Sequence, residues 1–137
     1  MPRNKKYRRI GYLTSIKHFA PISKADEIMD NGDKVVLTNE EFETIRLIDY
    51  KGYTQVECSK SMNIARTTVQ QLYSDARYKL SLLLLEGSNL YVDGGIIELV
   101  NDKELEREVG FEENELYRIR QRRNRGWRNR QFRNSDK

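Results

Sequence analysis

Apolar positions recur with helical spacing in the middle of the chain. Phe42, Ile45 and Ile48 lie three residues apart, which is typical of the buried face of an α-helix. Thr38 and Glu41 form a capping-box pattern just ahead of them, in which the hydroxyl and the carboxylate satisfy backbone N–H groups at a helix start. We therefore expect a helix to begin after Thr38 and to end near the glycine of the following Lys-Gly pair.

The next segment, QVECSKSMNIARTTVQQLYS over residues 55–74, has the spacing of two short helices packed across a tight turn. A second capping box, Thr54 with Glu57, marks the start of the first helix. Asn63 lies where the turn requires a left-handed backbone, which asparagine tolerates. The inward positions are Val56, Cys58, Ser59, Met62, Ile64, Val69 and Leu72. This pattern predicts a helix-turn-helix within residues 54–86.

The second of these helices is expected to begin near Ala65 and to continue to Gly87. Its buried stripe consists of Val69, Leu72, Ala76, Leu80 and Leu83. A helix of this length spans about 30 Å, more than a DNA groove requires, so its second half is expected to pack against other parts of the protein. The run from Leu82 to Leu85 is interpreted as core or as a dimer contact.

Shorter elements flank this core. Residues 10–19 are compatible with a short strand or with an irregular layer over the core, and residues 90–92 and 96–100 suggest two strands around an Asp-Gly-Gly turn. Such a hairpin is expected to cover the core, pair with a partner subunit or act as a wing. Asn101 or Asp102 is a candidate cap for a further helix, and Gly110 marks its expected break. The predicted fold class is mainly α, a three-helix helix-turn-helix core with a small β element.

Charge is divided sharply along the chain. Residues 1–9 and 118–137 together hold 14 of the 25 lysines and arginines and one acid, whereas residues 10–117 hold 11 bases and 20 acids. Basic blocks of this kind are typical of disordered segments that contact polyanions. The expected organisation is a basic arm over 1–9, a helix-turn-helix domain over 10–100, a helical extension over 101–117 and a disordered arginine-rich tail over 118–137.

The chemistry of the chain argues against several functions. One cysteine and one histidine leave no set of residues for a disulfide, a Cys/His metal site or a Ser/His/Asp triad, so no enzyme activity, cofactor or metal is expected. Cys58 is interpreted as a small core residue. No apolar run is long enough to span a membrane, and no signal peptide opens the chain. A cytoplasmic protein is expected.

Several segments together resemble a known family. They are the opening MPRNKKYRRIGYL, VVLTNEEFETIRLIDYKGYTQ, MNIARTTVQQLYSDARYKL and LYVDGG. In order they resemble uncharacterised protein family 0251 (domain of unknown function 134), whose members are small prokaryotic proteins, and the helical part is similar to region 4 of bacterial sigma factors. The resemblance implies a DNA-binding fold. One departure is Ala65, where the family usually has a serine that caps the recognition helix.

The outward positions of the second motif helix are the candidate contacts to DNA. The side chains predicted to read base edges are Arg66, Thr67, Gln70, Gln71 and Ser74. Those predicted to bind phosphates are Lys60, Thr68, Arg77, Lys79, Arg3, Lys5, Lys6, Arg8 and Arg9. The expected function is sequence-specific binding of double-stranded DNA by a transcriptional regulator, with a homodimer on a two-fold site as the expected assembly. The alternatives are a sigma-like protein that engages RNA polymerase, and an RNA-binding protein that uses the tail.

Overall fold

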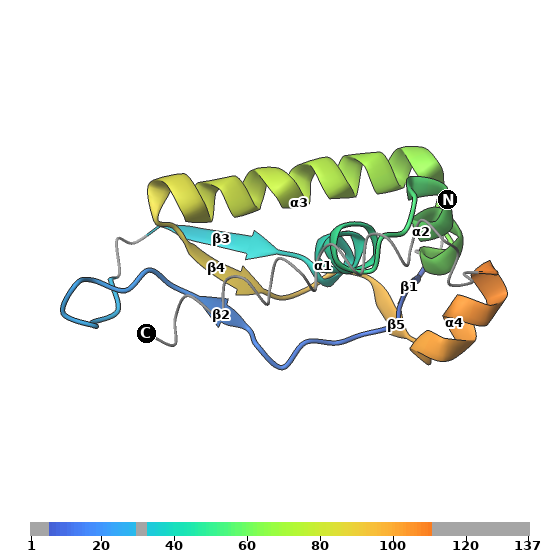
Figure 1. Ribbon diagram of the computed structural model, residues 1–137, viewed down its shortest axis with the longest axis horizontal. Coiled ribbons are helices and arrows are strands. Elements are labelled where there is room, and N and C mark those ends of the chain that lie inside the picture. The colour runs from blue at the N-terminus through green and yellow to red at the C-terminus, as the bar shows by residue number, and fades with distance from the viewer. Residues whose placement is uncertain (1–5, 30–32, 111–137) are drawn as a thin grey trace, which may run out of the picture.

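Figure 1 shows the computed structural model, which describes residues 6–29 and 33–110. The predictions for residues 111–137, and those for Arg3 and Lys5, lie outside these residues. The described chain is mixed but mostly helical. Its helices are α1 (Asn39–Thr44), η1 (Ile45–Tyr50), α2 (Gln55–Met62), α3 (Arg66–Glu86) and α4 (Asp102–Val109). Its strands are β1 (Arg8–Ile10), β2 (His18–Phe19), β3 (Lys34–Leu37), β4 (Asn89–Val92) and β5 (Ile97–Leu99).

Both predicted capping boxes are confirmed. The Thr38 Oγ1 atom accepts from the Glu41 amide at 3.2 Å, and the Glu41 carboxylate accepts from the Thr38 amide at 2.9 Å. Thr54 and Glu57 repeat the arrangement at the start of α2, at 3.1 and 2.8 Å. Each box satisfies two backbone donors that the first helical turn leaves without a partner.

The helix predicted from Thr38 to Tyr50 changes character half-way. After Thr44 it widens into a π-helix, η1. A π-helix has more residues per turn than an α-helix, so it shifts which side chains face inward. Leu47 is consequently the fully buried residue of η1, whereas the predicted Ile45 and Ile48 are half-buried.

The turn between α2 and α3 is as tight as the sequence predicts. Asn63 adopts a left-handed backbone with φ 56° and ψ 49°, and the Ile64 amide donates to the Ser59 carbonyl at 3.0 Å. A buried cluster fastens the two helices to η1, and its members are Leu47, Tyr53, Cys58, Met62 and Val69. Burial raises the pKa of the Cys58 thiol to about 12, so the thiol is protonated at neutral pH and serves as core.

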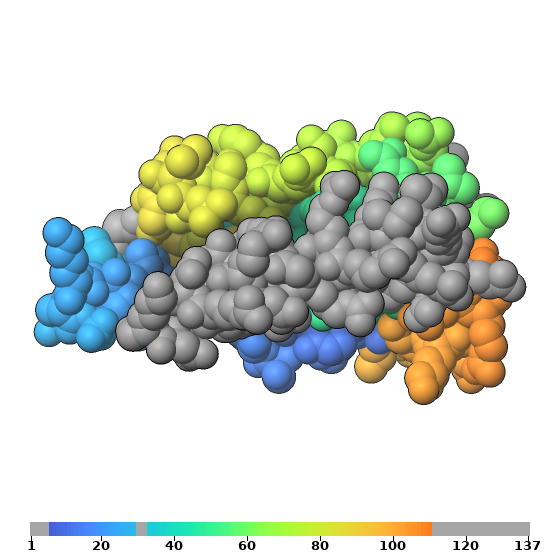
Figure 2. Space-filling model, in the orientation of Figure 1, coloured from blue at the N-terminus to red at the C-terminus, as the bar shows by residue number. Residues whose placement is uncertain are grey.

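The long helix α3 lies along one face of a three-stranded sheet of order β2-β4-β3 (Figure 1). In the space-filling view its green-to-yellow surface runs along the top of the molecule (Figure 2). Strand β4 pairs with β3 in parallel and with β2 antiparallel. Leu37, Leu90 and Val92 point from this sheet to Ala76 and form a second buried cluster. The second half of α3 therefore packs against the sheet, as its length predicts, while Leu84 and Leu85 remain exposed.

The predicted hairpin over residues 90–100 is wrong. The two strands exist, but β5 pairs in parallel with β1 and belongs to a separate two-stranded sheet. Gly94 and Gly95 have φ of +78° and +99° and carry the chain from one sheet to the other. The burial of Leu90 and Val92 beneath α3 determines where β4 lies, and this burial outweighs the local preference for a hairpin turn.

Helix α4 is the last described element and lies at the end of the molecule away from the three-stranded sheet (Figure 1). The Asn101 side chain caps it, and Gly110 ends it with a left-handed backbone, as the sequence predicts. Leu105 is fully buried, and α4 packs against α2. Among the described residues, none of the helices combines the length and the apolar character that a membrane span requires.

A charged cluster holds α4 to η1. Arg46 donates to Glu43 at 2.7 Å and to Asp102 at 3.0 Å, and Lys51 pairs with Asp102 and Glu106. Burial opposes ionisation of the Asp102 carboxyl, but hydrogen bonds from Arg46 and Lys51 outweigh it and lower its pKa. Gly11, which directly follows β1, also contacts this cluster, because its amide donates to Glu43 at 2.7 Å.

Candidate nucleic-acid interface

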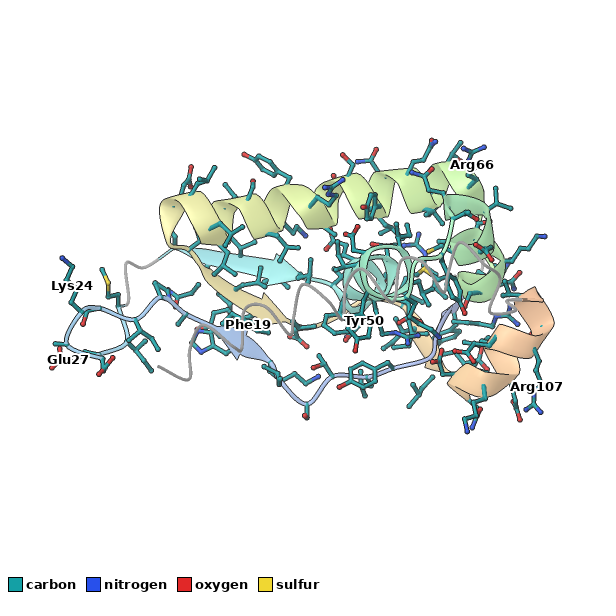
Figure 3. All side chains as sticks on the ribbon, viewed as in Figure 1. Phe19, Lys24, Glu27, Tyr50, Arg66 and Arg107 are labelled. Carbon is teal, nitrogen blue, oxygen red and sulfur yellow. The ribbon has the colours of Figure 1, made fainter. Side chains whose placement is uncertain are left out.

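The first three turns of α3 present a polar face to solvent. The five predicted base-reading side chains lie on it, and all are exposed: Arg66, Thr67, Gln70, Gln71 and Ser74. Val69 and Ala76, on the other side of the same helix, are fully buried. Figure 3 shows Arg66 at the start of α3, pointing away from the body of the protein. The helix is therefore fixed by its apolar side while its polar side stays accessible.

Gln71 has a partner that the sequence analysis did not single out. Its Nε2 atom donates to Asp75 Oδ1 at 3.0 Å, one helical turn further along. A carboxylate only accepts hydrogen bonds, so this contact orients the amide and leaves Oε1 and the second N–H free to meet a base. The spacing of four residues between glutamine and aspartate was the available signal.

Arg77 lies over a tyrosine ring that the prediction also missed, and that tyrosine is in turn fixed by Asp49. Its guanidinium lies 5.2 Å from the centre of the Tyr73 ring, within the range of a cation–π contact. The Tyr73 hydroxyl donates to Asp49 Oδ1 of η1 at 2.6 Å. Burial, together with the hydrogen bond to Asp49, raises the pKa of Tyr73. The arginine thus has a defined position next to the exposed polar face of α3.

Lys60, Thr68 and Lys6 are the remaining candidate phosphate contacts among the described residues that are at least partly accessible to solvent. Lys60 is exposed at the end of α2, and Lys6 is exposed ahead of β1. Thr68 is half-buried in the first turn of α3. No side chain caps that turn, because position 65 is alanine. The outward N–H groups of a helix start are suited to bind phosphate oxygens.

Three other predicted phosphate contacts are engaged within the protein. Arg8 pairs with Glu40. Arg9 donates to the Lys60 carbonyl at 2.8 Å, to the Ser61 carbonyl and to Glu108. Lys79 reaches back across the fold to Glu41 and to the Val36 carbonyl, both at 2.7 Å. Each of the three is paired with a carboxylate, and two of them also donate to backbone carbonyls, so we do not carry these three residues into the interface proposed below.

The first part of the chain matches a known protein family. A family model described as "Protein of unknown function DUF134" matches residues 1–100. The chain belongs to this family. Its members include a UPF0251 protein of Desulfitobacterium hafniense, 45% identical over 97 residues that cover 69% of this chain and 74% of the relative. A UPF0251 protein of Pyrococcus abyssi is 37% identical over 97 residues, or 71% of this chain and 86% of the relative.

The family match covers some elements of the fold and not others. Residues 1–100 contain the whole of α2 and α3, so the candidate interface lies within the part that family members share. Helix α4 begins at Asp102, outside the matched residues. No solved structure shows a significant match to the chain.

Proposed function

We propose that α2, the Asn63 turn and α3 form a helix-turn-helix, and that this protein binds double-stranded DNA in a sequence-specific manner as a transcriptional regulator. The observation that carries the proposal is the two-sided character of α3. Its apolar side is buried in the core, and five side chains able to hydrogen-bond to bases are exposed on the other side. A helix of this kind fits the major groove with its first turns against the base edges.

Each side chain has a chemical role in this proposal. Arg66 pairs with the O6 and N7 atoms of guanine, and Gln70 and Gln71 pair with the N6 and N7 atoms of adenine. Thr67 and Ser74 provide short hydroxyl contacts to base edges. Phosphates are bound by a separate set, consisting of Lys60, Thr68, Arg77 and Lys6. These contacts supply affinity and fix the register on DNA but carry no sequence information.

The test is a genomic binding selection at a stated salt concentration, performed with the full chain and with the variant Gln70→Ala/Gln71→Ala. We expect the wild type to enrich a defined motif and the variant to lose preference at the base pairs that the two glutamines contact. Each lost paired contact should cost about 1–3 kcal/mol of binding free energy. Glu104→Ala, which removes an exposed side chain of α4, is the control and should enrich the wild-type motif.

Two results contradict the proposal. One is a wild-type selection that enriches no motif, and the other is a motif that persists unchanged in the double-glutamine variant. Salt dependence provides a second measurement, because each phosphate contact contributes about −0.9 to the slope of log K against log salt on duplex DNA. Arg77→Ala should reduce the magnitude of this slope by about that amount and leave the motif unchanged.

A further inference from the structure

Two adjacent glutamines in the first turns of α3 differ in what holds their side-chain amides. Gln71 Nε2 donates to Asp75 Oδ1 at 3.0 Å. The side-chain amide of Gln70 makes no hydrogen bond to any other described residue. Both glutamines are exposed, whereas Asp75 is half-buried. The two side chains are chemically identical, so this difference in freedom arises from the residue that lies next to each of them.

Asp75 is available to Gln71 because the nearest cation along the helix is used elsewhere. Lys79 lies four residues after Asp75, which is the usual spacing of an ion pair on a helix. Its Nζ atom instead bonds to Glu41 and to the Val36 carbonyl, both at 2.7 Å. Within the part of the chain that the structure describes, no lysine or arginine forms an ion pair with Asp75. The carboxylate is therefore free to hold the Gln71 amide.

An ionised carboxylate determines which way this amide points. A glutamine amide can turn over about its last side-chain bond, and the turn exchanges its donor with its acceptor. A carboxylate only accepts hydrogen bonds. The reversed amide would place Gln71 Oε1 against Asp75 Oδ1, two acceptors with no proton between them. Asp75 therefore selects the orientation in which Nε2 faces the carboxylate and Oε1 faces away from it.

The selected orientation fits an adenine. In the major groove adenine presents the N6 donor next to the N7 acceptor. One N–H of Gln71 Nε2 bonds to Asp75, and the second N–H together with Oε1 forms an edge that complements N7 and N6. The amide of Gln70 has no such restraint, so it must be ordered when it meets a base. Ordering a flexible side chain on binding offsets part of the free energy of its contact.

We propose that Asp75 is a specificity-determining residue, which makes Gln71 a strict reader of adenine while Gln70 remains an adaptable reader that tolerates other bases. This inference rests on the proposed DNA-binding function. Asp75 is a positioning residue, because it acts through the Gln71 amide and contacts no base. Its negative charge also repels DNA phosphates. That repulsion lowers the affinity for every DNA sequence equally, and it therefore adds no preference among bases.

The test compares affinities for the selected motif and for duplexes with one base pair changed, at one salt concentration and with the full chain. Selections with Gln70→Ala and with Gln71→Ala first assign the base pair that each glutamine contacts. Changing the Gln71 base pair should weaken wild-type binding about 5- to 150-fold. Asp75→Ala should reduce this ratio about 2- to 12-fold, because the amide is no longer ordered in advance. The ratio at the Gln70 base pair should stay at its wild-type value, while affinity for DNA without the motif should rise.

Two further variants of Asp75 separate its hydrogen bond from its charge and from its effect on the helix. Asp75→Asn has an amide that donates as well as accepts, so it permits both orientations of Gln71 and should reduce the ratio as alanine does. Asp75→Glu keeps an acceptor-only group and should retain the wild-type ratio. Glu104→Ala, at an exposed position of α4, is the control and should also retain it. A glutamine–aspartate pair that only stabilises the helix would leave the ratio unchanged in all four variants.

A second measurement needs no DNA. Side-chain ¹⁵N relaxation in the full chain reports motion on the picosecond-to-nanosecond timescale, and the order parameter of Gln71 Nε2 should exceed that of Gln70 Nε2. Asp75→Ala should bring the two values together, and equal values in the wild type overturn the inference. A wild-type selection that enriches no motif overturns the proposed function and this inference with it. A motif that depends on Gln71 but keeps its ratio in Asp75→Ala overturns this inference alone.

Discussion

Two groups of polar and cationic side chains, both predicted to contact DNA, are used differently by the fold. In β1, Arg8 and Arg9 turn inward and bind Glu40, Glu108 and backbone carbonyls of α2. On α3, Arg66 and Gln70 point to solvent, and among the described residues no side chain binds them. The first group fastens the start of the chain to the helices, whereas the second is held in place only through the helix that carries it.

The difference shows that a basic sequence does not by itself define a binding surface. Arg9 is occupied because α2 ends beside β1 and presents the carbonyls of Lys60 and Ser61, which carry partial negative charge at a helix end. Within the described residues no carboxylate or carbonyl bonds to Arg66 at the start of α3, and position 65 lacks a capping side chain. Substitutions therefore distinguish residues that stabilise the fold from residues that are exposed and unpaired on α3.

The largest effect is expected from Glu43→Ala, in the charged cluster that holds α4 to η1. Glu43 is fully buried, binds Arg46 and accepts from the Gly11 amide. Removing one partner of a buried ion pair costs about 3–5 kcal/mol, and urea unfolding of the full chain measures this loss. Glu98→Ala, at an exposed position of β5, is the control. A loss similar to that of the control would contradict a structural role for the cluster.

A pair of arginine variants tests the comparison directly. Arg9→Ala should lower the free energy of unfolding by about 1.5–3 kcal/mol, because charge-assisted bonds to two carbonyls are lost. Arg66→Ala should change it by no more than about 0.5 kcal/mol, as is usual for exposed positions. DNA affinity should show the reverse order in a titration at fixed salt. Equal effects of the two variants on stability would remove the distinction between the groups.

A smaller effect is expected from Ala65→Ser, which restores a cap at the start of α3. Residue 65 has the extended backbone of an N-cap, with φ −67° and ψ 149°, so a serine hydroxyl can accept from a first-turn amide. The expected gain in unfolding free energy is about 1 kcal/mol. Ala65→Val supplies no acceptor and should give no gain. The same result from serine and valine would show that the turn amides are already satisfied.

The smallest effect concerns pH. The pKa of Asp102 is lowered in the folded state by its hydrogen bonds to Arg46 and Lys51, against the effect of burial. Its contribution to stability is therefore present above the ordinary aspartate pKa of about 3.9 and is lost as the pH falls through the lowered value. Asp102→Asn should flatten this acid dependence in urea unfolding measured from pH 6 downward. An unchanged dependence would assign the acid loss to other carboxyls.

Local sequence was sufficient to predict the elements near the candidate interface. The two capping boxes, the left-handed Asn63 and the stop at Gly87 each depend on residues within a few positions of one another. The buried and exposed sides of α3 follow from helical periodicity in the same way. The π-helix after Thr44 gave no local signal, and the assignment of Ile45 and Ile48 to the core was only partly right for that reason.

Local sequence patterns could not predict contacts between residues that lie far apart in the chain. Asp49 lies 24 residues from Tyr73, and Lys79 lies 38 residues from Glu41, so no spacing rule connects them. The separate sheets of β4 and β5 depend on which partner strands lie beside them, not on the Asp-Gly-Gly turn between them.

The sequence by itself determined where most helices begin and end and which side of α3 carries polar residues, because those properties arise from bonds and contacts within a few residues. Only the tertiary structure decided which charges are free. In the sequence, Arg8, Arg9 and Lys79 cannot be distinguished from Arg66. In the fold, however, these three side chains bond to carboxylates and carbonyls from distant parts of the chain. A charge is available to a partner only when the fold has not already neutralised it.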